Sequence, residues 1–214
     1  DIIGGSMKRF ILLTTLLLFV STRFACGNTL DNNNEGENDM DYETMELGYS
    51  EYLKDTNPVV TMEVEGKGTM TLQLFPDVAP NSVNNMIHLI NEGYYDGLIF
   101  HRVIETFMIQ GGWGEGELCP IAGEFNSNGF NNELKHSRGV LSMARTMNPN
   151  SATSQFFIMH QNSPHLDGQY AGFGGLIDGF DVLDDIATAQ TNASDRPLSD
   201  IVIKRVPVDT KGIA

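Results

Sequence analysis

The 214-residue sequence contains little cysteine and little positive charge, and these shortages exclude several classes of protein. Its two cysteines, Cys26 and Cys119, are too few for a disulfide framework, and their spacing matches no zinc-binding pattern. The five histidines include no His-x-x-x-His pair, so we expect no metal site. Only 13 basic residues accompany 28 acidic ones, and the net charge of -15 argues against nucleic acid and anionic membranes as partners.

The rest of the composition is that of a globular protein. Hydrophobic residues make up 41% of the chain, charged residues make up 19%, and there are 22 glycines. A chain of this length is typical of one domain of ordinary size with additional segments, and it can bury a core without disulfides.

The first 25 residues have the pattern of an export signal. Residues 1–6 precede the first methionine, and we interpret them as an expression scar or as upstream residues. Lys8 and Arg9 then precede an apolar run over 10–20, whose 11 residues are too few for a membrane-spanning helix of roughly 20. We therefore predict a signal peptide over residues 7–25, and the alternative is a buried core helix.

Cys26 follows Ala25, and this junction resembles the lipobox of bacterial lipoproteins, although Arg23 stands where the lipobox usually has leucine. We expect either lipidation of Cys26 after cleavage or simple secretion. Both outcomes place the protein outside the cytoplasm, in the periplasm or as a membrane-anchored lipoprotein. Cys119 is then the single unmodified thiol, and in an oxidising compartment we expect it to be buried and unreactive.

Residues 26–57 form an acidic segment before the globular part. Nine acidic residues and one lysine lie within residues 31–57, and this composition cannot bury enough apolar surface to offset the entropy of ordering. We predict a flexible tether, in which the tyrosines and leucine of residues 42–53 allow a short helix against the domain. The alternative is a binding site for a cationic partner.

Residues 58–207 have the pattern of a β-rich domain, and a C-terminal tail follows over 208–214. Helical spacing of apolar residues predicts one helix from Pro80 to about Gly93 and another over 180–188. Many short strands without a βαβ rhythm favour a closed antiparallel barrel or a sandwich. Alternating and β-branched runs predict these strands over residues 59–64, 69–74, 98–104, 107–110, 140–144, 155–159, 172–176 and 201–206.

Three sequence blocks carry the residues that indicate a function. In the first, residues 100–112, a strand would place Arg102 on one face between Phe100 and Ile104. A cation among apolar side chains indicates a concave, mostly apolar binding site, and the alternative is an edge strand whose arginine extends into water. The other blocks lie at residues 138–145 with 154–158 and at residues 166–174.

In order and spacing, these blocks resemble the cyclophilin family of peptidyl-prolyl cis-trans isomerases. The motifs are Phe-His-Arg-Val-Ile with Phe-Met-Ile-Gln-Gly-Gly, then Gly-Val-Leu-Ser-Met-Ala, Ser-Gln-Phe-Phe-Ile and Leu-Asp-Gly. The resemblance implies a mainly β fold, a closed eight-stranded antiparallel β-barrel capped by two α-helices. It also implies a shallow groove that holds an Xaa-Pro segment of an unfolded or flexible protein, without a cofactor or metal. We expect a monomer, the default for a barrel that lacks an extra apolar face.

Carried over by motif, the resemblance assigns roles to particular residues. Arg102 is the catalytic arginine, and Gln110 orients it. The proline ring is bound by Phe107, Met108, Phe157 and Leu166. The residues before proline are held by Ala144, Gln155 and the backbone of Arg145.

Three positions depart from the best-known pattern of the family. His165 stands where a tryptophan precedes Leu-Asp-Gly, and the loss of the indole weakens the expected binding of cyclosporin. Tyr170 replaces a histidine in the pocket wall, and Arg145 replaces an asparagine whose backbone the family uses. Since none of these changes affects Arg102, we expect an active isomerase. The alternatives are a binding module of this fold that holds proline segments without turning them and, more distantly, a β-barrel lectin or carrier.

The Ala25-Cys26 junction gives a testable prediction about processing. Mass spectrometry of the protein from its native source should show a mature chain that begins at a lipid-modified Cys26. Cys26→Ser should abolish the modification, because the thiol is the atom that would carry the lipid. A mature chain that begins at another residue would contradict lipidation and leave export intact.

Overall fold

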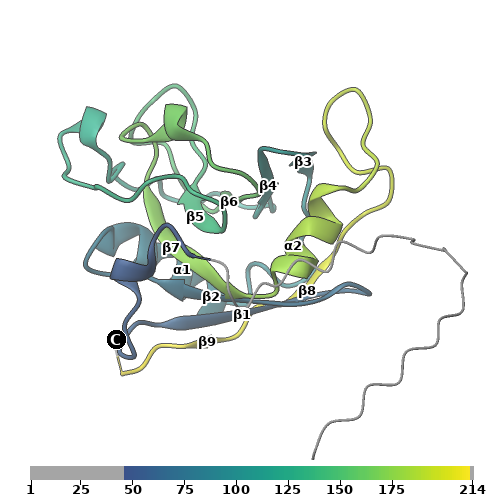
Figure 1. Ribbon diagram of the computed structural model, residues 1–214, viewed down its shortest axis with the longest axis horizontal. Coiled ribbons are helices and arrows are strands. Elements are labelled where there is room, and N and C mark those ends of the chain that lie inside the picture. Colours follow the sequence, from purple (N-terminus) through teal and green to yellow (C-terminus); the bar gives the residue numbers. More distant parts are fainter. Residues whose placement is uncertain (1–45, 213–214) are drawn as a thin grey trace, which may run out of the picture. The chain divides into compact units, whose positions relative to one another are not determined.

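The computed structural model describes residues 46–212. The strands are β1 Val59–Val64, β2 Gly68–Leu74, β3 Arg102–Ile104, β4 Met108–Gly111, β5 Val140–Met143, β6 Phe156–Met159, β7 Gly172–Asp178, β8 Ile203–Arg205 and β9 Val208–Asp209. They form one sheet in the order β3-β4-β6-β5-β7-β2-β1-β8, and β9 pairs with β1 outside this path. All pairings are antiparallel, and Figure 1 shows the sheet curling round from β3 to β8.

The predicted mainly β, eight-stranded antiparallel fold is confirmed, but the word "closed" overstates it. β3 and β8 are the two ends of the strand path. In the described residues these ends meet through an isolated bridge between Ile99 and Val202 and through a backbone hydrogen bond from Phe100 N to Ile201 O at 3.0 Å. The sheet is therefore a half-barrel whose two edges are joined by the segments next to β3 and β8.

The alternation of side chains along each strand explains how the half-barrel is filled. In β1, Val60, Met62 and Val64 are buried in the core, and the intervening residues are partly exposed. In β6 every residue is buried, because Phe156 packs in the main core while Phe157 packs in a second, smaller cluster. A strand buried on both faces can therefore support the core and a surface pocket at once.

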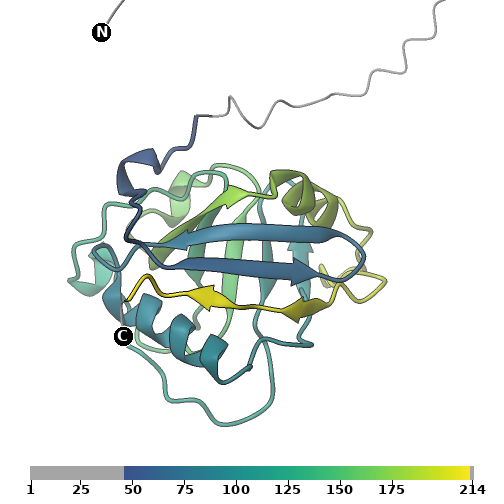
Figure 2. The same ribbon diagram turned by 90° about the horizontal axis from the view of Figure 1, so that it is seen from below.

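Two α-helices cover the sheet, as predicted. α1 (Pro80–Asn91) and α2 (Phe180–Ala187) lie on opposite sides of the strip formed by β2, β1 and β9 (Figure 2). At the start of α1, the backbone N–H groups of Asn81 and Ser82 each donate at 2.8 Å to the buried carboxylate of Glu124. Within residues 46–212, none of the helices is long and apolar enough to cross a membrane. Short 3-10 helices lie in the connections: η2 Ser50–Tyr52, η3 Asn126–Asn128 and η4 Pro164–Leu166.

The last part of the predicted acidic tether is packed onto the sheet. Residues 46–57 include η2, a short helix within the range 42–53 where the sequence allowed one, and Tyr49 just before it is fully buried. Tyr49 Oη donates a hydrogen bond of 2.5 Å to Leu176 O on β7. The flexible-tether prediction therefore does not hold for residues 46–57, because Tyr49 is buried and Leu47, Tyr52 and Leu53 pack against the same cluster.

Two glycines leave the space that the Tyr49 ring fills. A Cβ atom at Gly175 would lie 2.3 Å from a ring carbon of Tyr49, and a Cβ atom at Gly139 would lie 2.3 Å from its hydroxyl. Burial raises the pKa of Tyr49, so the hydroxyl stays protonated and remains a donor. The segment before β1 thus fits a site that lies more than 80 positions further along the chain.

Two other predictions change in the described structure. The predicted tail over 208–214 contributes β9, which extends the domain past the predicted boundary by pairing with β1. Cys119, predicted to be buried, is exposed, because the surrounding loop of glycines and acidic residues packs little against the core. The predictions for residues 1–6, for the signal peptide over 7–25 and for Cys26 lie outside the described residues.

Removing the Tyr49 hydroxyl tests whether residues 46–57 belong to the folded domain. Tyr49→Phe leaves the Leu176 carbonyl without its donor and should lower the free energy of unfolding by about 1–3 kcal/mol. Tyr49→Ala also creates a cavity and should lower it by about 3–5 kcal/mol. Urea denaturation measures both values, with Glu51→Ala at an exposed position as the control. Unchanged unfolding of Tyr49→Ala would mean that the segment is not packed in solution.

Candidate active site

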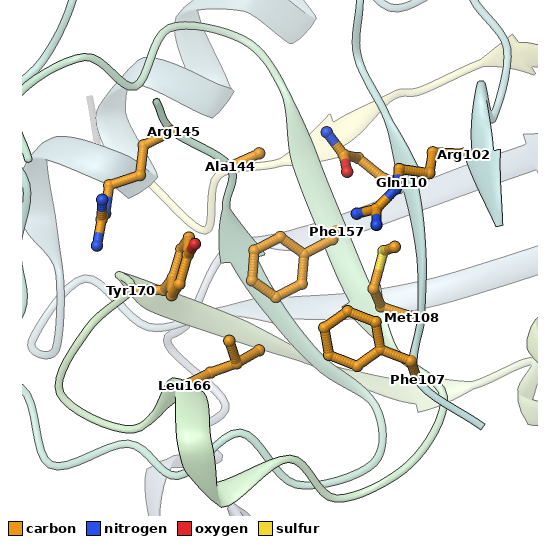
Figure 3. A pocket seen from close by; sticks show the side chains of 9 residues that line it. All are labelled: Arg102, Phe107, Met108, Gln110, Ala144, Arg145, Phe157, Leu166 and Tyr170. Atoms are coloured by element: carbon orange, nitrogen blue, oxygen red, sulfur yellow. The ribbon is translucent and has the colours of Figure 1, made fainter. Parts of the chain in front are cut away.

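A pocket of about 370 Å³ opens beside β3, β4 and β6. The register of these strands places Arg102 opposite Gln110 and Gln110 opposite Phe157. Side chains that are far apart in the sequence therefore meet in one row across the sheet. The lining residues, shown in Figure 3, are Arg102, Phe107, Met108, Gln110, Ala144, Arg145, Phe157, Leu166 and Tyr170.

Every lining residue is one that the sequence analysis assigned to the site. The two remaining assigned residues contact the lining from outside. Gln155 Oε1 accepts a hydrogen bond from Gln110 Nε2 at 3.0 Å, and the His165 ring stacks on Phe107 with 5.7 Å between centroids. The structure thus brings all the assigned residues of the described chain together, while their chemical roles stay predictions.

Arg102 is the first residue of β3, at an end of the strand path. Its side chain is 42% exposed and faces the pocket, whereas the next residue, Val103, is buried in the core. The prediction that Phe100 shares a face with Arg102 is wrong, since Phe100 is fully buried in the main core. The reason is that regular strand alternation begins only at Arg102.

The guanidinium of Arg102 is held by Asp195, a residue that the sequence analysis did not select. Arg102 Nε donates to Asp195 Oδ2 at 3.3 Å, and Val103 N donates to Asp195 O at 2.8 Å. The predicted partner Gln110 donates to Gln155 instead. Asp195 lies in a turn, 93 positions from Arg102, and has a φ of 61°. In the sequence, only the turn-forming residues around it could have indicated a turn there, and nothing local indicated its contact with Arg102.

Aromatic rings form most of the apolar surface of the pocket. In Figure 3 the Phe157 ring lies at the centre, and Tyr170 meets it edge-on with 5.8 Å between centroids. The buried His136 ring stacks on Phe157 at 6.1 Å and 22°. Such a surface suits a compact apolar ring that carries few hydrogen-bonding groups. Three buried side chains of the pocket lining, Met108, Phe157 and Leu166, belong to the same hydrophobic cluster.

An Asp-His-Ser chain next to the pocket has the order of a hydrolase triad but not its exposure. His136 Nδ1 lies 3.3 Å from Asp167 Oδ1, and His136 Nε2 lies 3.0 Å from Ser142 Oγ. Ser142 is fully buried, so its hydroxyl cannot attack a substrate in the pocket. Burial lowers the pKa of His136, and the neutral ring joins β5 to the residue after η4, which carries Leu166.

The turn that presents Phe107 is fastened by His160. Thr106 has a left-handed backbone with a φ of 65° and donates its N–H to His160 Nδ1 at 2.9 Å. His160 N donates to Phe107 O at 2.9 Å, and His160 Nε2 lies 3.0 Å from Asp184 Oδ1 on α2. Burial lowers the pKa of His160, and the neutral form is the one whose Nδ1 can accept this hydrogen bond.

Within residues 46–212, no group of three or more His, Cys, Asp or Glu side chains could hold a metal ion. The charged residues of the pocket lining are Arg102 and Arg145. Fold and site together define a class of protein, an antiparallel half-barrel that presents an arginine beside an apolar pocket of aromatic rings. This arrangement suits an extended peptide with one apolar ring.

Comparison with known proteins assigns the family. The family model for cyclophilin type peptidyl-prolyl cis-trans isomerase/CLD matches residues 59–208. This chain therefore belongs to the cyclophilin family of peptidyl-prolyl cis-trans isomerases, as its motifs predicted.

Individual relatives agree with the family model. Peptidyl-prolyl cis-trans isomerase CYP18-1 of Arabidopsis thaliana is 43% identical over 152 residues, which are 69% of this chain and 94% of that protein. A putative peptidyl-prolyl cis-trans isomerase of Staphylococcus haemolyticus is 36% identical over 191 residues, 74% of this chain and 95% of that protein. A crystal structure of a Cryptosporidium parvum cyclophilin type isomerase in the presence of the dipeptide Ala-Pro has a TM-score of 0.64 and 34% identity, covering 71% of this chain and 98% of that one.

His136 gives the domain a pH-dependent stability whose sign follows from its lowered pKa. In the unfolded chain a histidine takes up its proton near pH 6.5, roughly its ordinary pKa, whereas the buried ring takes it up at lower pH. Below this pH the unfolded state binds more protons than the folded state. The free energy of unfolding should therefore fall as the pH drops from about 6.5, by at most about 1.4 kcal/mol per pH unit for this group.

Thermal unfolding from about pH 8 to pH 5 measures this slope. His136→Gln should make the profile shallower without flattening it, because burial also lowers the pKa values of His101 and His160. His88→Gln is the control, since His88 is an exposed residue of α1. A His136→Gln profile with the original slope would refute the assignment of this titration to His136.

Proposed function

We propose that this isomerase accelerates rotation about Xaa-Pro bonds with the proline ring on the aromatic pocket and the guanidinium of Arg102 beside the prolyl nitrogen. The observation that supports this arrangement is the position of Arg102. Its guanidinium lies at the rim of an apolar pocket whose floor is the Phe157 ring (Figure 3). A charged donor and a surface for an apolar ring are thus adjacent.

The barrier to this rotation is electronic. It is about 18–20 kcal/mol, because the nitrogen lone pair is delocalised into the carbonyl group. As the bond twists, the lone pair returns to nitrogen and can accept a hydrogen bond. Arg102 is always charged, and with Nε engaged by Asp195 its terminal N–H groups remain for the substrate. A donor already in position stabilises the twisted state more than the planar one.

The pocket confines the rotation to one bond. The side chains of Phe107, Met108 and Leu166 hold the ring on Phe157, while Gln155 and the backbone around Ala144 hold the residues before proline. The Gln110–Gln155 hydrogen bond keeps these two amides in place between the ring pocket and the preceding residues. The reaction needs no covalent intermediate, so an unreactive, buried Ser142 is compatible with it.

The enzyme works outside the cytoplasm as a monomer and assists the folding of proteins with Xaa-Pro segments. The predicted signal peptide over 7–25 and the lipobox-like Cys26 support this location. Uncatalysed isomerisation takes tens to hundreds of seconds, roughly the time that limits folding of proline-containing chains. The acidic residues between Cys26 and the described domain serve as a spacer from the membrane surface.

Replacing Arg102 tests the proposed chemistry. Arg102→Ala should lower kcat/KM for an Xaa-Pro peptide by about 100- to 1000-fold, the usual effect of losing one preorganised donor. Arg102→Lys should also be strongly impaired, because an ammonium group cannot reproduce the planar guanidinium. Asp195→Asn should cost much less, since it weakens the support of Arg102 and leaves the donor. NMR exchange spectroscopy of a labelled peptide measures turnover.

Binding must be measured beside turnover. Peptide affinity, followed by NMR titration, should change little in Arg102→Ala because the aromatic pocket remains. Near-normal turnover by this variant would refute the role of the guanidinium. Equal losses of binding and turnover would show that Arg102 only holds the substrate. A wild-type domain that binds proline peptides without isomerising their Xaa-Pro bond would be a binding module.

A further inference from the structure

Arg145 lines one end of the pocket, and its guanidinium is held rigidly (Figure 3). Nε and Nη2 donate to Gln169 O at 3.1 and 2.8 Å, and Nη1 donates to Thr146 O at 2.9 Å. The guanidinium also lies 4.5 Å from the ring centroid of Tyr170 and 5.0 Å from that of Phe125. Hydrogen bonds and ring faces therefore orient this cation before any ligand binds.

Among residues 46–212, no carboxylate is paired with the charge of Arg145. None of the ion pairs among the described residues includes Arg145, whose hydrogen-bond acceptors are backbone carbonyl oxygens. Arg102, the other charged lining residue, is paired with Asp195. Three N–H groups of Arg145 are used in these bonds, and a guanidinium has five. At one end of the pocket, Arg145 thus carries a charge that no carboxylate of residues 46–212 pairs with, in a chain of net charge -15.

We propose that Arg145 makes the enzyme prefer peptides with an acidic side chain two residues before the proline. The inference rests on the proposed function, in which the residues before proline pass over Ala144 and Arg145. A carboxylate there can accept the remaining N–H groups and neutralise the charge of Arg145, which is unpaired within the described part of the chain. An asparagine, which Arg145 replaces relative to the common pattern of the family, would supply no charge.

A purely structural role makes a different prediction. Arg145 joins the loop after β5 to the loop that carries Gln169, and this clamp alone would support the pocket for every peptide equally. The distinguishing measurement is therefore a ratio of two peptides on the same variant. General damage to the pocket cancels in such a ratio, whereas a lost charge preference does not.

The test uses peptides of the form Ala-Zaa-Ala-Pro-Phe with Zaa as Glu, Gln or Lys. The wild-type domain should turn over the Glu peptide with a kcat/KM about two- to fivefold above that of the Gln peptide, and the Lys peptide should be poorest. The preference should shrink at about 1 M salt, where charges are screened over roughly 3 Å. Ala-Gln-Ala-Pro-Glu, with its acid after proline, is the control peptide and should gain nothing over the Gln peptide.

Two variants at one position complete the test. Arg145→Gln should bring the Glu to Gln ratio close to one, while Arg145→Lys should keep part of it because the charge remains. Equal turnover of the Glu and Gln peptides by the wild type, or an unchanged ratio in Arg145→Gln, would overturn the role of Arg145 and leave the isomerase standing. Failure of the wild type to turn over any peptide would instead contradict the proposed function.

Discussion

The site depends on the register of three antiparallel strands. Backbone pairing of β3, β4 and β6 places Arg102, Gln110 and Phe157 in one row. A slip of β4 by one residue would point Gln110 into the core and bring Ile109 to the pocket. Ile109 is fully buried among the core side chains, so the hydrophobic packing of the half-barrel holds the polar groups of the site in place. Stability and geometry of the site therefore have the same origin.

Two buried histidines support this row without lining the pocket. His136 stacks on the Phe157 ring, and His160 accepts the N–H of Thr106 in the strained turn before Phe107. Burial lowers both pKa values and favours the neutral rings, and His160 must be neutral for its Nδ1 to accept this hydrogen bond. Asp167 beside His136 and Asp184 beside His160 favour the charged forms, but the cost of burying a cation outweighs them. The aromatic surface is thus held by groups whose protonation state the fold itself determines.

Local patterns were sufficient for most of the fold, and the motifs shared with the cyclophilin family were sufficient for the lining of the pocket. Alternation and helical spacing depend on neighbouring residues, so β1 and both helices lie within a few residues of their predicted bounds. Two of the failures concern contacts over long sequence distances. Residues 46–57 were assigned to a tether because the composition of the segment is acidic. The space for Tyr49 is made by Gly139 and Gly175, which lie far along the chain from this segment. Closure was overstated because strand count does not show whether the edges pair.

By itself, the sequence determined the family, the antiparallel β fold and the residues that meet in the pocket, because motifs and periodicity are properties of neighbouring positions. Only the tertiary structure decided which partners those residues have. Arg102 pairs with Asp195 instead of Gln110, and Arg145 is fixed by Gln169 and Tyr170, with no carboxylate from the described residues. Hydrogen bonds and charge pairing depend on distances between atoms that the chain brings together only when it folds. Patterns of neighbouring residues do not determine those distances.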